Sequence, residues 1–183
     1  ATQTAAMQAE PLGSVTEDML VNPPASSWLM YRGNHESWGY SALDEITPES
    51  VSALSLAWSV GMDPGSNQTT PVVHDGKLYI AHPNDVITAL DATTVDLVWE
   101  YRHEGTADIW GPGGITRAIA IYDDKIYHAA ADARIIALSA KTGELVWDSS
   151  VGDPTRITHY SRPIVAGSRE NTGRTCGYKA PAR

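Results

Sequence analysis

Short runs of apolar residues alternate with polar residues along the middle of this chain, and turn-forming residues separate the runs. Residues 77–81 and 86–91 are two such runs, and Asp75 and Gly76 immediately precede the first of them. Alternation with a period of two predicts a strand with one buried face. Glycine favours turns because it permits positive φ. The pattern therefore predicts several short β-strands joined by tight turns.

The same pattern occurs twice. The sequence DGKLY at residues 75–79 returns as DDKIY at 123–127, and ITALDATTVDLVW at 87–99 returns as IIALSAKTGELVW at 135–147. The two copies align without a gap, because Trp99 and Trp147 lie 48 positions apart. Each copy predicts strand, turn, strand, turn and a last strand that ends on tryptophan.

A repeat of this length is typical of the blades of a β-propeller, which have about 40–50 residues and four short strands. A single four-stranded blade leaves apolar faces uncovered, so it has to stack on neighbouring blades. The sequence therefore predicts an all-β fold of the β-propeller type. Two chance hairpins in a β-sandwich are the alternative, and the gapless match between the copies argues against them.

The segment before the repeats is predicted with less regular structure. Residues 1–24 are polar without a clear period and are interpreted as an extended arm on the body of the protein, with residues 25–183 forming the first blades. Thr47 and Pro48 are typical of a helix start, as an N-cap and a first helical residue. We expect Val51 and Leu54 to face the core from this short helix, and residues 54–60 to follow as a strand.

Composition limits the function classes. The chain has 183 residues, 42% of them hydrophobic, and a net charge of -9. This acidity argues against nucleic-acid binding, which depends on basic surfaces. No apolar run approaches the roughly 18 residues that a membrane-spanning helix needs. The first residues, ATQTAA, are typical of an end left by processing after export.

Cys176 is the single cysteine of the sequence. One interpretation is a buried or free thiol, and the other is a disulfide with a partner outside this chain. The sequence leaves both interpretations open.

Residues 137–147 have the pattern Ala-Leu-x-Ala-x-Thr-Gly-x-x-x-Trp, and residues 89–99 have a degraded copy in which Val95 replaces the glycine. This pattern resembles the tryptophan-docking motif of quinoprotein dehydrogenases. The resemblance implies that Trp99 and Trp147 pack between adjacent blades. An indole suits such a wedge, because it is large and apolar and has one N–H to satisfy. These tryptophans are therefore interpreted as structural.

The stretch before the first repeat is more discriminating. Residues 28–58, which include WLMYRGN and WGYSAL, are similar to the opening of PQQ-dependent alcohol dehydrogenases, although Ala42 and Ser50 depart from the usual Pro and Asn. Residues 68–79 resemble the next strand of that family. The resemblance extends from about residue 22 to residue 163, and it is closest to the branch of sorbose, sorbosone and polyvinyl-alcohol dehydrogenases.

The resemblance implies an eight-bladed propeller of which this chain contains about the first three blades. It implies PQQ-dependent oxidation of a primary or secondary alcohol, sugar alcohols included, to an aldehyde or ketone in the periplasm. The implied partners are the alcohol, a cytochrome c-type electron acceptor and the remainder of the propeller. The alternative is a non-catalytic propeller of the outer-membrane assembly type that binds other proteins.

Two residues are the first candidates for contact with PQQ. Residues 115–121 resemble a family segment whose arginine pairs with PQQ near its quinone oxygens, and Arg117 occupies that place. The planar guanidinium suits two oxygens at once. Gln68 stands where the methanol and ethanol enzymes have a Glu that contacts PQQ. Glutamine keeps the hydrogen-bonding capacity and loses the charge.

Two further candidates lie near the end of the chain. In residues 157–163 the resemblance implies a hydroxyl for PQQ from Thr158, with Tyr160 as the alternative. Residues 173–177 lie where the family has further PQQ contacts, and Thr175 is the candidate there.

No metal ligand is assigned to this chain. Tyr178 falls at the place of the family's metal-binding Glu, and tyrosine is a poor ligand for calcium. The divalent cation implied by the family is calcium, or a lanthanide in some members. Its ligands and the catalytic base are expected beyond residue 183.

Overall fold

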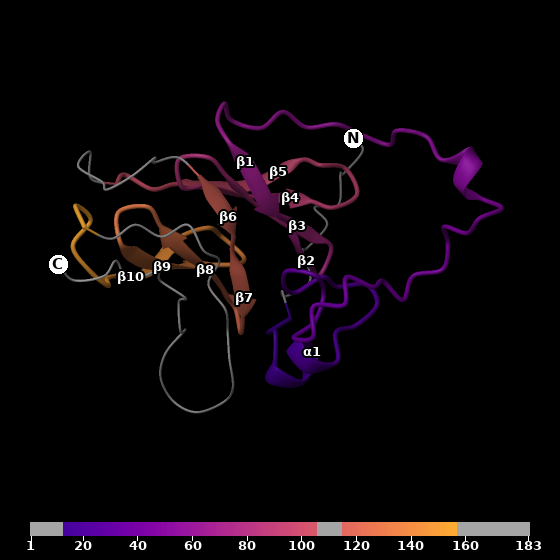
Figure 1. Ribbon diagram of the computed structural model, residues 1–183, viewed down its shortest axis with the longest axis horizontal. Helices are drawn as coiled ribbons and strands as arrows, with labels where there is room; N and C mark the ends of the chain where they lie inside the picture. The colour runs from indigo at the N-terminus through magenta and orange to yellow at the C-terminus, as the bar shows by residue number, and fades with distance from the viewer. Residues whose placement is uncertain (1–12, 106–114, 157–183) are drawn as a thin grey trace, which may run out of the picture.

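The computed structural model describes residues 13–105 and 115–156 of the chain. Two four-stranded antiparallel sheets and one parallel strand pair contain most of the regular secondary structure of these residues (Figure 1). The one α-helix of this part is α1 (Glu17–Val21), and a single 3-10 turn is η1 (Val51–Ala53). Within these residues the all-β prediction is confirmed.

The first sheet has the strand order β2-β3-β4-β5 and the second the order β7-β8-β9-β10, so each is a simple meander. The strands of the first sheet are β2 (Val72–His74), β3 (Lys77–His82), β4 (Val86–Asp91) and β5 (Leu97–Arg102). The strands of the second are β7 (Ala120–Tyr122), β8 (Lys125–Ala130), β9 (Arg134–Ser139) and β10 (Leu145–Ser150).

The strands reproduce the sequence repeat. Each strand of the second sheet begins 48 positions after its counterpart, as with Lys77 in β3 and Lys125 in β8. Two details of the prediction were wrong. The matched repeat was interpreted as three strands, whereas β2 and β7 complete the four that a blade was predicted to have, and β5 continues past Trp99 to Arg102. The charged residues after Trp99 remain in the strand because β4 continues to pair with them.

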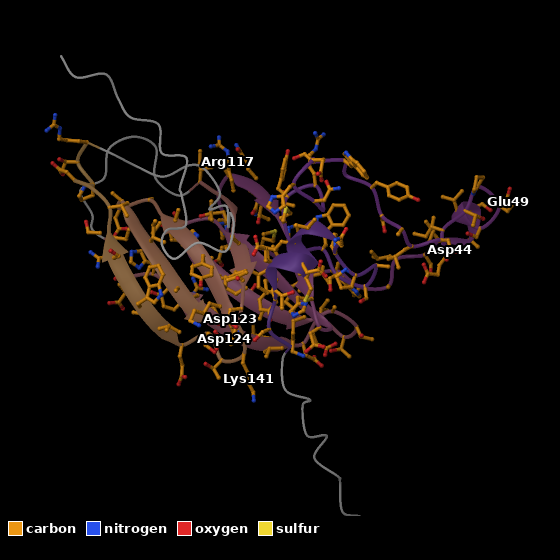
Figure 2. All side chains as sticks on the ribbon, turned by 90° about the horizontal axis from the view of Figure 1, so that it is seen from below. Asp44, Glu49, Arg117, Asp123, Asp124 and Lys141 are labelled. Atoms are coloured by element: carbon orange, nitrogen blue, oxygen red, sulfur yellow. The ribbon has the colours of Figure 1, made fainter. Side chains whose placement is uncertain are left out.

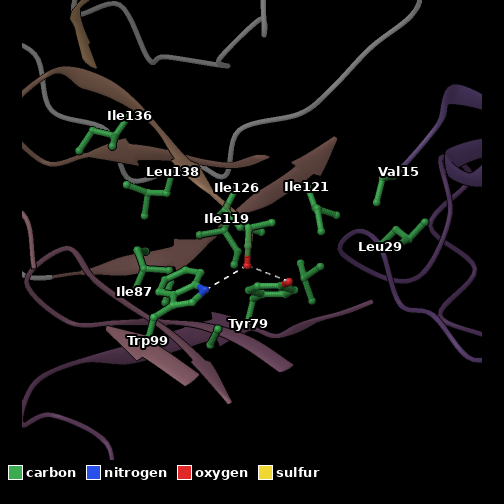
Figure 3. Close-up of a cluster of buried hydrophobic side chains, with 14 of the residues drawn as sticks. Val15, Leu29, Tyr79, Ile87, Trp99, Ile119, Ile121, Ile126, Ile136 and Leu138 are labelled. Carbon is green, nitrogen blue, oxygen red and sulfur yellow. Dashed lines mark hydrogen bonds between the residues drawn. The ribbon is translucent and has the colours of Figure 1, made fainter. Parts of the chain in front are cut away.

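The core lies between the two sheets, and Trp99 and Tyr79 contribute to it from the first sheet (Figure 3). The Trp99 Nε1–H donates to the Ala140 carbonyl at 3.0 Å, and the Tyr79 hydroxyl donates to the same oxygen at 3.2 Å. The two ring centroids are 6.0 Å apart. Burial raises the pKa of Tyr79 well above its ordinary value, so its hydroxyl stays protonated and acts as a donor. Two buried polar groups of the first sheet are thus satisfied by one carbonyl of the second.

Gly143 makes the close approach of Trp99 feasible. Its φ is +73°, and a Cβ atom at this position would lie 2.6 Å from the Trp99 ring. Any other residue would meet both the left-handed backbone and the indole. The glycine of the second repeat therefore serves the tryptophan of the first.

Trp147 occupies the equivalent position at the outer strand of the second sheet. Its ring lies 6.0 Å from Tyr127, as Trp99 lies from Tyr79, but the residue is 41% exposed whereas Trp99 is 7% exposed. The contact between tryptophan and tyrosine within one sheet therefore occurs in both repeats. Within the described residues, only Trp99 is also covered by a neighbouring sheet.

The described part of the N-terminal segment lies on the sheets. Val15 is fully buried and bridges to Asp123 at the edge of the second sheet, and Trp28 bridges to Val73 in β2. Between them, Thr16 caps α1 by accepting the Met19 amide at 3.4 Å. The sequence interpretation did not include this helix, because five residues have no clear period.

The expectations for residues 47–60 were wrong. Thr47 does accept the Ser50 amide at 3.2 Å, but only the single turn η1 follows. Val51 and Leu54 are 49% and 60% exposed instead of facing the core, and residues 54–60 form no strand. This segment extends away from the sheets, as the positions of Asp44 and Glu49 in Figure 2 show. With no apolar surface to pack on, a short helix does not repay its nucleation cost.

No helix among the described residues is long and apolar enough to cross a membrane.

Candidate functional site

The parallel strands β1 (Asn67–Thr70) and β6 (Thr116–Ala118) form the third sheet. They pair with Asn67 opposite Thr116 and Thr70 opposite Ala118. β1 directly precedes the first meander and β6 directly precedes the second. Equivalent segments of the two repeats are thus hydrogen-bonded to each other, which brings residues far apart in the sequence to one place between the sheets (Figure 1).

Gln68 and Arg117 meet on this strand pair. The Arg117 Nε–H donates to Gln68 Oε1 at 2.9 Å, across 49 positions of sequence, and both residues are exposed. Figure 2 places Arg117 on the opposite side of the sheets from Asp123, Asp124 and Lys141. The structure therefore brings together two of the four predicted cofactor contacts, at one end of the sheets and open to solvent.

Thr116 points the other way from Arg117, as neighbours in a strand do. Thr116 is 4% exposed, and its hydroxyl donates to Asp85 Oδ1 at 3.4 Å. Asp85 belongs to the turn between β3 and β4, in the first meander. One face of β6 thus presents Arg117 to solvent while the other face is bonded to a buried carboxylate.

Asp85 is a hub of polar contacts. His128 Nε2 lies 2.8 Å from its Oδ1, and the Ala131 amide donates to its Oδ2 at 2.9 Å. A carboxylate only accepts hydrogen bonds, so His128 Nε2 is the donor. His128 is completely buried and the Asp85 side chain is 11% exposed. The network therefore ties the turn of one meander to two places in the next.

The ionisation of Asp85 follows from these contacts. Burial is the largest influence and by itself raises the pKa, but His128 and the Ala131 amide together hold the pKa of Asp85 below its ordinary value. The carboxylate is therefore ionised at neutral pH, as hydrogen bonding to the charged form requires.

The backbone of Asp85 also takes an unusual conformation. Asn84 and Asp85 have φ values of +63° and +57°, as a tight hairpin turn requires. Asparagine and aspartate adopt such angles more readily than most residues. The β3–β4 turn therefore directs the Asp85 carboxylate toward the second meander and away from solvent.

A second buried pair lies beside the first. His103 Nε2 lies 2.9 Å from Asp132 Oδ2, with side-chain exposures of 7% and 4%. The His103 amide also donates to the Asp85 carbonyl at 3.2 Å. Sequence reasoning missed both His–Asp pairs. Their members are separated by 43 and 29 positions, and acidic residues in turns are usually solvated.

The remaining predicted contacts, Thr158 and Thr175, lie outside the described residues, as do Tyr160, Cys176 and Tyr178. Over residues 13–105 and 115–156, no group of three or more His, Cys, Asp or Glu side chains could hold a metal ion.

Two repeated meanders, with the tryptophan of the first set against the turn of the second, define part of a β-propeller. The family of PQQ-dependent enzymes described as "Glucose/ethanol/alcohol dehydrogenase, beta-propeller domain" matches residues 28–159 of this sequence. The chain belongs to that family, and the resemblance to PQQ-dependent alcohol dehydrogenases predicted from its opening segment and repeats is confirmed.

Curated relatives agree with this assignment. Quinohemoprotein alcohol dehydrogenase ADH-IIG of Pseudomonas putida is 36% identical over 76 residues, which are 41% of this chain and 11% of the relative. The dehydrogenase subunit of alcohol dehydrogenase (quinone) of Gluconobacter oxydans is 37% identical over 75 residues, 40% of this chain and 10% of the relative. The 1-butanol dehydrogenase (cytochrome c) of Thauera butanivorans is 32% identical over 78 residues, 42% of this chain and 11% of the relative.

Solved structures show the same fold. The ADHIIG enzyme of Pseudomonas putida HK5 superposes with a TM-score of 0.76 at 26% identity, over 86% of this chain and 24% of that one. A europium-containing methanol dehydrogenase superposes with a TM-score of 0.75 at 26% identity, over 82% of this chain and 28% of that one. The chain thus spans about a quarter of the solved structures it matches.

Proposed function

We propose that the protein to which this chain belongs oxidises an alcohol to an aldehyde or ketone with PQQ as its cofactor, and that Gln68 and Arg117 contribute to the PQQ site. The observation that carries the proposal is the Arg117–Gln68 hydrogen bond of 2.9 Å within the family's propeller domain. Two polar side chains from different repeats converge there, as a shared ligand site requires.

The chemistry of the pair suits PQQ, a flat quinone with three carboxylates. Arginine has five N–H donors in a planar fork, and the Gln68 contact uses the Nε–H. Gln68 holds the guanidinium in orientation without neutralising its charge, whereas a glutamate would pair with it ionically. Bound PQQ would supply the hydride acceptor for alcohol oxidation, and Arg117 and Gln68 would help to hold it. The role of Arg117 is to bind and orient oxygens of the quinone.

Other components of the proposal belong to the rest of the protein. We assign the catalytic base and the ligands of a divalent cation, calcium or a lanthanide, to segments beyond residue 183. Relatives named for cytochrome c and for europium support a cytochrome c-type acceptor and a metal ion of this kind. Thr158 and Thr175 remain proposed PQQ contacts, and the periplasm remains the proposed location. The family match favours this enzyme over a non-catalytic propeller.

The first test is the affinity of the full-length apoprotein for PQQ. Arg117→Ala removes a charge-assisted contact, which is worth about 1.5–3 kcal/mol, so we expect the Kd to rise about 10- to 100-fold. Arg117→Lys keeps the charge without the fork and should bind with intermediate affinity. A fluorescence titration with PQQ measures each value.

Arg134→Ala is the matched control, because Arg134 of β9 pairs with Asp148 of β10 within the second sheet. We expect it to bind PQQ as the unmodified protein does. An Arg117→Ala variant with unchanged affinity would remove Arg117 from the site. Full-length protein that fails to bind PQQ at all would refute the proposed function.

A further inference from the structure

Asp85 is buried, belongs to the first meander, and has no place among the residues proposed to contact PQQ. Its carboxylate nevertheless makes its contacts with the second repeat. His128 and the Ala131 amide hold it firmly, at 2.8 and 2.9 Å, and Thr116 donates to it from β6 at 3.4 Å. The first two contacts fix the carboxylate relative to the second meander. The third connects β6 to that fixed point.

Thr116 and Arg117 are adjacent on a strand of three residues. β6 has β1 as its partner in the described sheet, and their register shifts between the two ends of the pairing. A short strand with an irregular ladder is weakly positioned by backbone bonds alone. The side-chain bond from Thr116 to Asp85 supplies a second attachment on the face opposite Arg117.

We infer that Asp85, acting through Thr116, is a positioning residue that holds β6 so that Arg117 meets Gln68 in the geometry needed to bind PQQ. The inference rests on the proposed function for the identity of the ligand. In this inference, buried Asp85 of the first repeat determines the orientation of Arg117, a proposed cofactor contact of the second repeat. The role is indirect, because the hydrogen bonds of the Asp85 carboxylate lie with Thr116, His128 and the Ala131 amide.

The test uses the full-length apoprotein and two measurements, the PQQ affinity and the crystal structure of each apo variant. Thr116→Val removes the hydroxyl at nearly constant shape. The loss of one hydrogen bond of about 1 kcal/mol predicts a roughly fivefold rise in the Kd for PQQ. Thr116→Ser retains the hydroxyl donor, so its Kd for PQQ should lie within about twofold of that of the unmodified protein. Asp85→Asn should weaken binding at least as much as Thr116→Val.

Asp148→Asn is the control for general destabilisation. It removes the carboxylate charge from the 2.6 Å contact between Arg134 of β9 and Asp148 of β10, which involves neither β1 nor β6, and should leave the Kd unchanged. The decisive comparison is made in an Arg117→Ala background, where Thr116→Val should have no further effect because the residue through which it acts is gone.

Equal effects of Thr116→Val and Asp148→Asn, or additive effects of Thr116→Val and Arg117→Ala, would overturn the inference. The apo crystal structures separate this failure from that of the proposed function. If the unmodified protein does not bind PQQ, a displaced Arg117 side chain in Thr116→Val alone still supports positioning. An Arg117–Gln68 contact retained at 2.9 Å in Thr116→Val refutes it.

Discussion

At the scale of single residues, Gly143 and Trp99 lie closer together than a Cβ atom at position 143 would allow. Glycine is required at this position for two reasons. Its φ is +73°, and a Cβ atom would lie only 2.6 Å from the indole ring. In the first repeat Val95 stands at the equivalent position with a φ of +59°. A β-branched residue in this region is strained, so the first repeat retains the turn at an energetic cost.

Gly143→Ala should lower the free energy of unfolding by about 2–4 kcal/mol, because it adds overpacking to backbone strain. The matched control is Gly76→Ala, at a φ of +67° with nothing within 4 Å of the added Cβ. That variant has only the backbone cost, about 1 kcal/mol. Urea denaturation of both variants measures the difference, and equal losses would show that Trp99 does not restrict position 143.

At the scale of elements, the turns between strands do more than reverse the chain. The β3–β4 turn carries Asp85 into a buried network with His128, and a second turn carries Asp132 to His103. Buried charged groups of this kind are tolerated only when they are paired. The two meanders are therefore held in register by polar pairs at one end and by apolar packing at the centre.

The lowered pKa of Asp85 predicts a pH dependence. A carboxyl whose pKa is lower in the folded state stabilises the fold above its unfolded pKa, about 3.9, and loses that contribution as the pH falls toward the folded value. We expect Asp85→Asn to be less stable than the unmodified protein at pH 7, and the difference to shrink below about pH 4.

Urea denaturation as a function of pH measures this convergence. Thr116→Val keeps the carboxylate, so its difference from the unmodified protein should change little over the same range. A constant difference for Asp85→Asn would contradict the ionised, hydrogen-bonded state of Asp85.

At the scale of the whole molecule, the two meanders are successive units of a ring. Trp99 is covered by the second meander, whereas Trp147 is 41% exposed with the same internal contact to tyrosine. We propose that the next unit of the propeller covers Trp147 as the second covers Trp99. Apolar residues of the segment before β1, such as Leu56 at 84% exposure, are proposed to pack on the remainder of the ring in the same way.

Trp147→Ala tests this arrangement. In the full-length protein it should cost about 3–5 kcal/mol of the free energy of unfolding, as expected for a buried tryptophan and for Trp99→Ala. In the isolated 183-residue chain it should cost distinctly less than Trp99→Ala. Denaturation of both variants at both chain lengths makes the comparison. A small loss for Trp147→Ala in the full-length protein would show that its ring is not covered.

The sequence by itself determined the blade. Strand alternation, turn residues and the 48-residue repeat are local properties, so they predicted β3, β4 and their counterparts closely. The resemblance also selected Gln68 and Arg117 from their surrounding motifs. The sequence pattern gave a wrong prediction for residues on which nothing packs. Val51 and Leu54 are apolar, as core residues are, but they are exposed because no other element covers them.

Tertiary structure alone decided which distant residues meet. The parallel pairing of β1 with β6 put Gln68 beside Arg117, and the β3–β4 turn put Asp85 against His128 and Thr116. These contacts join segments about 30 to 50 positions apart. Such contacts depend on how one meander stacks on the next, and burial there turns an ordinary turn aspartate into a paired, ionised group.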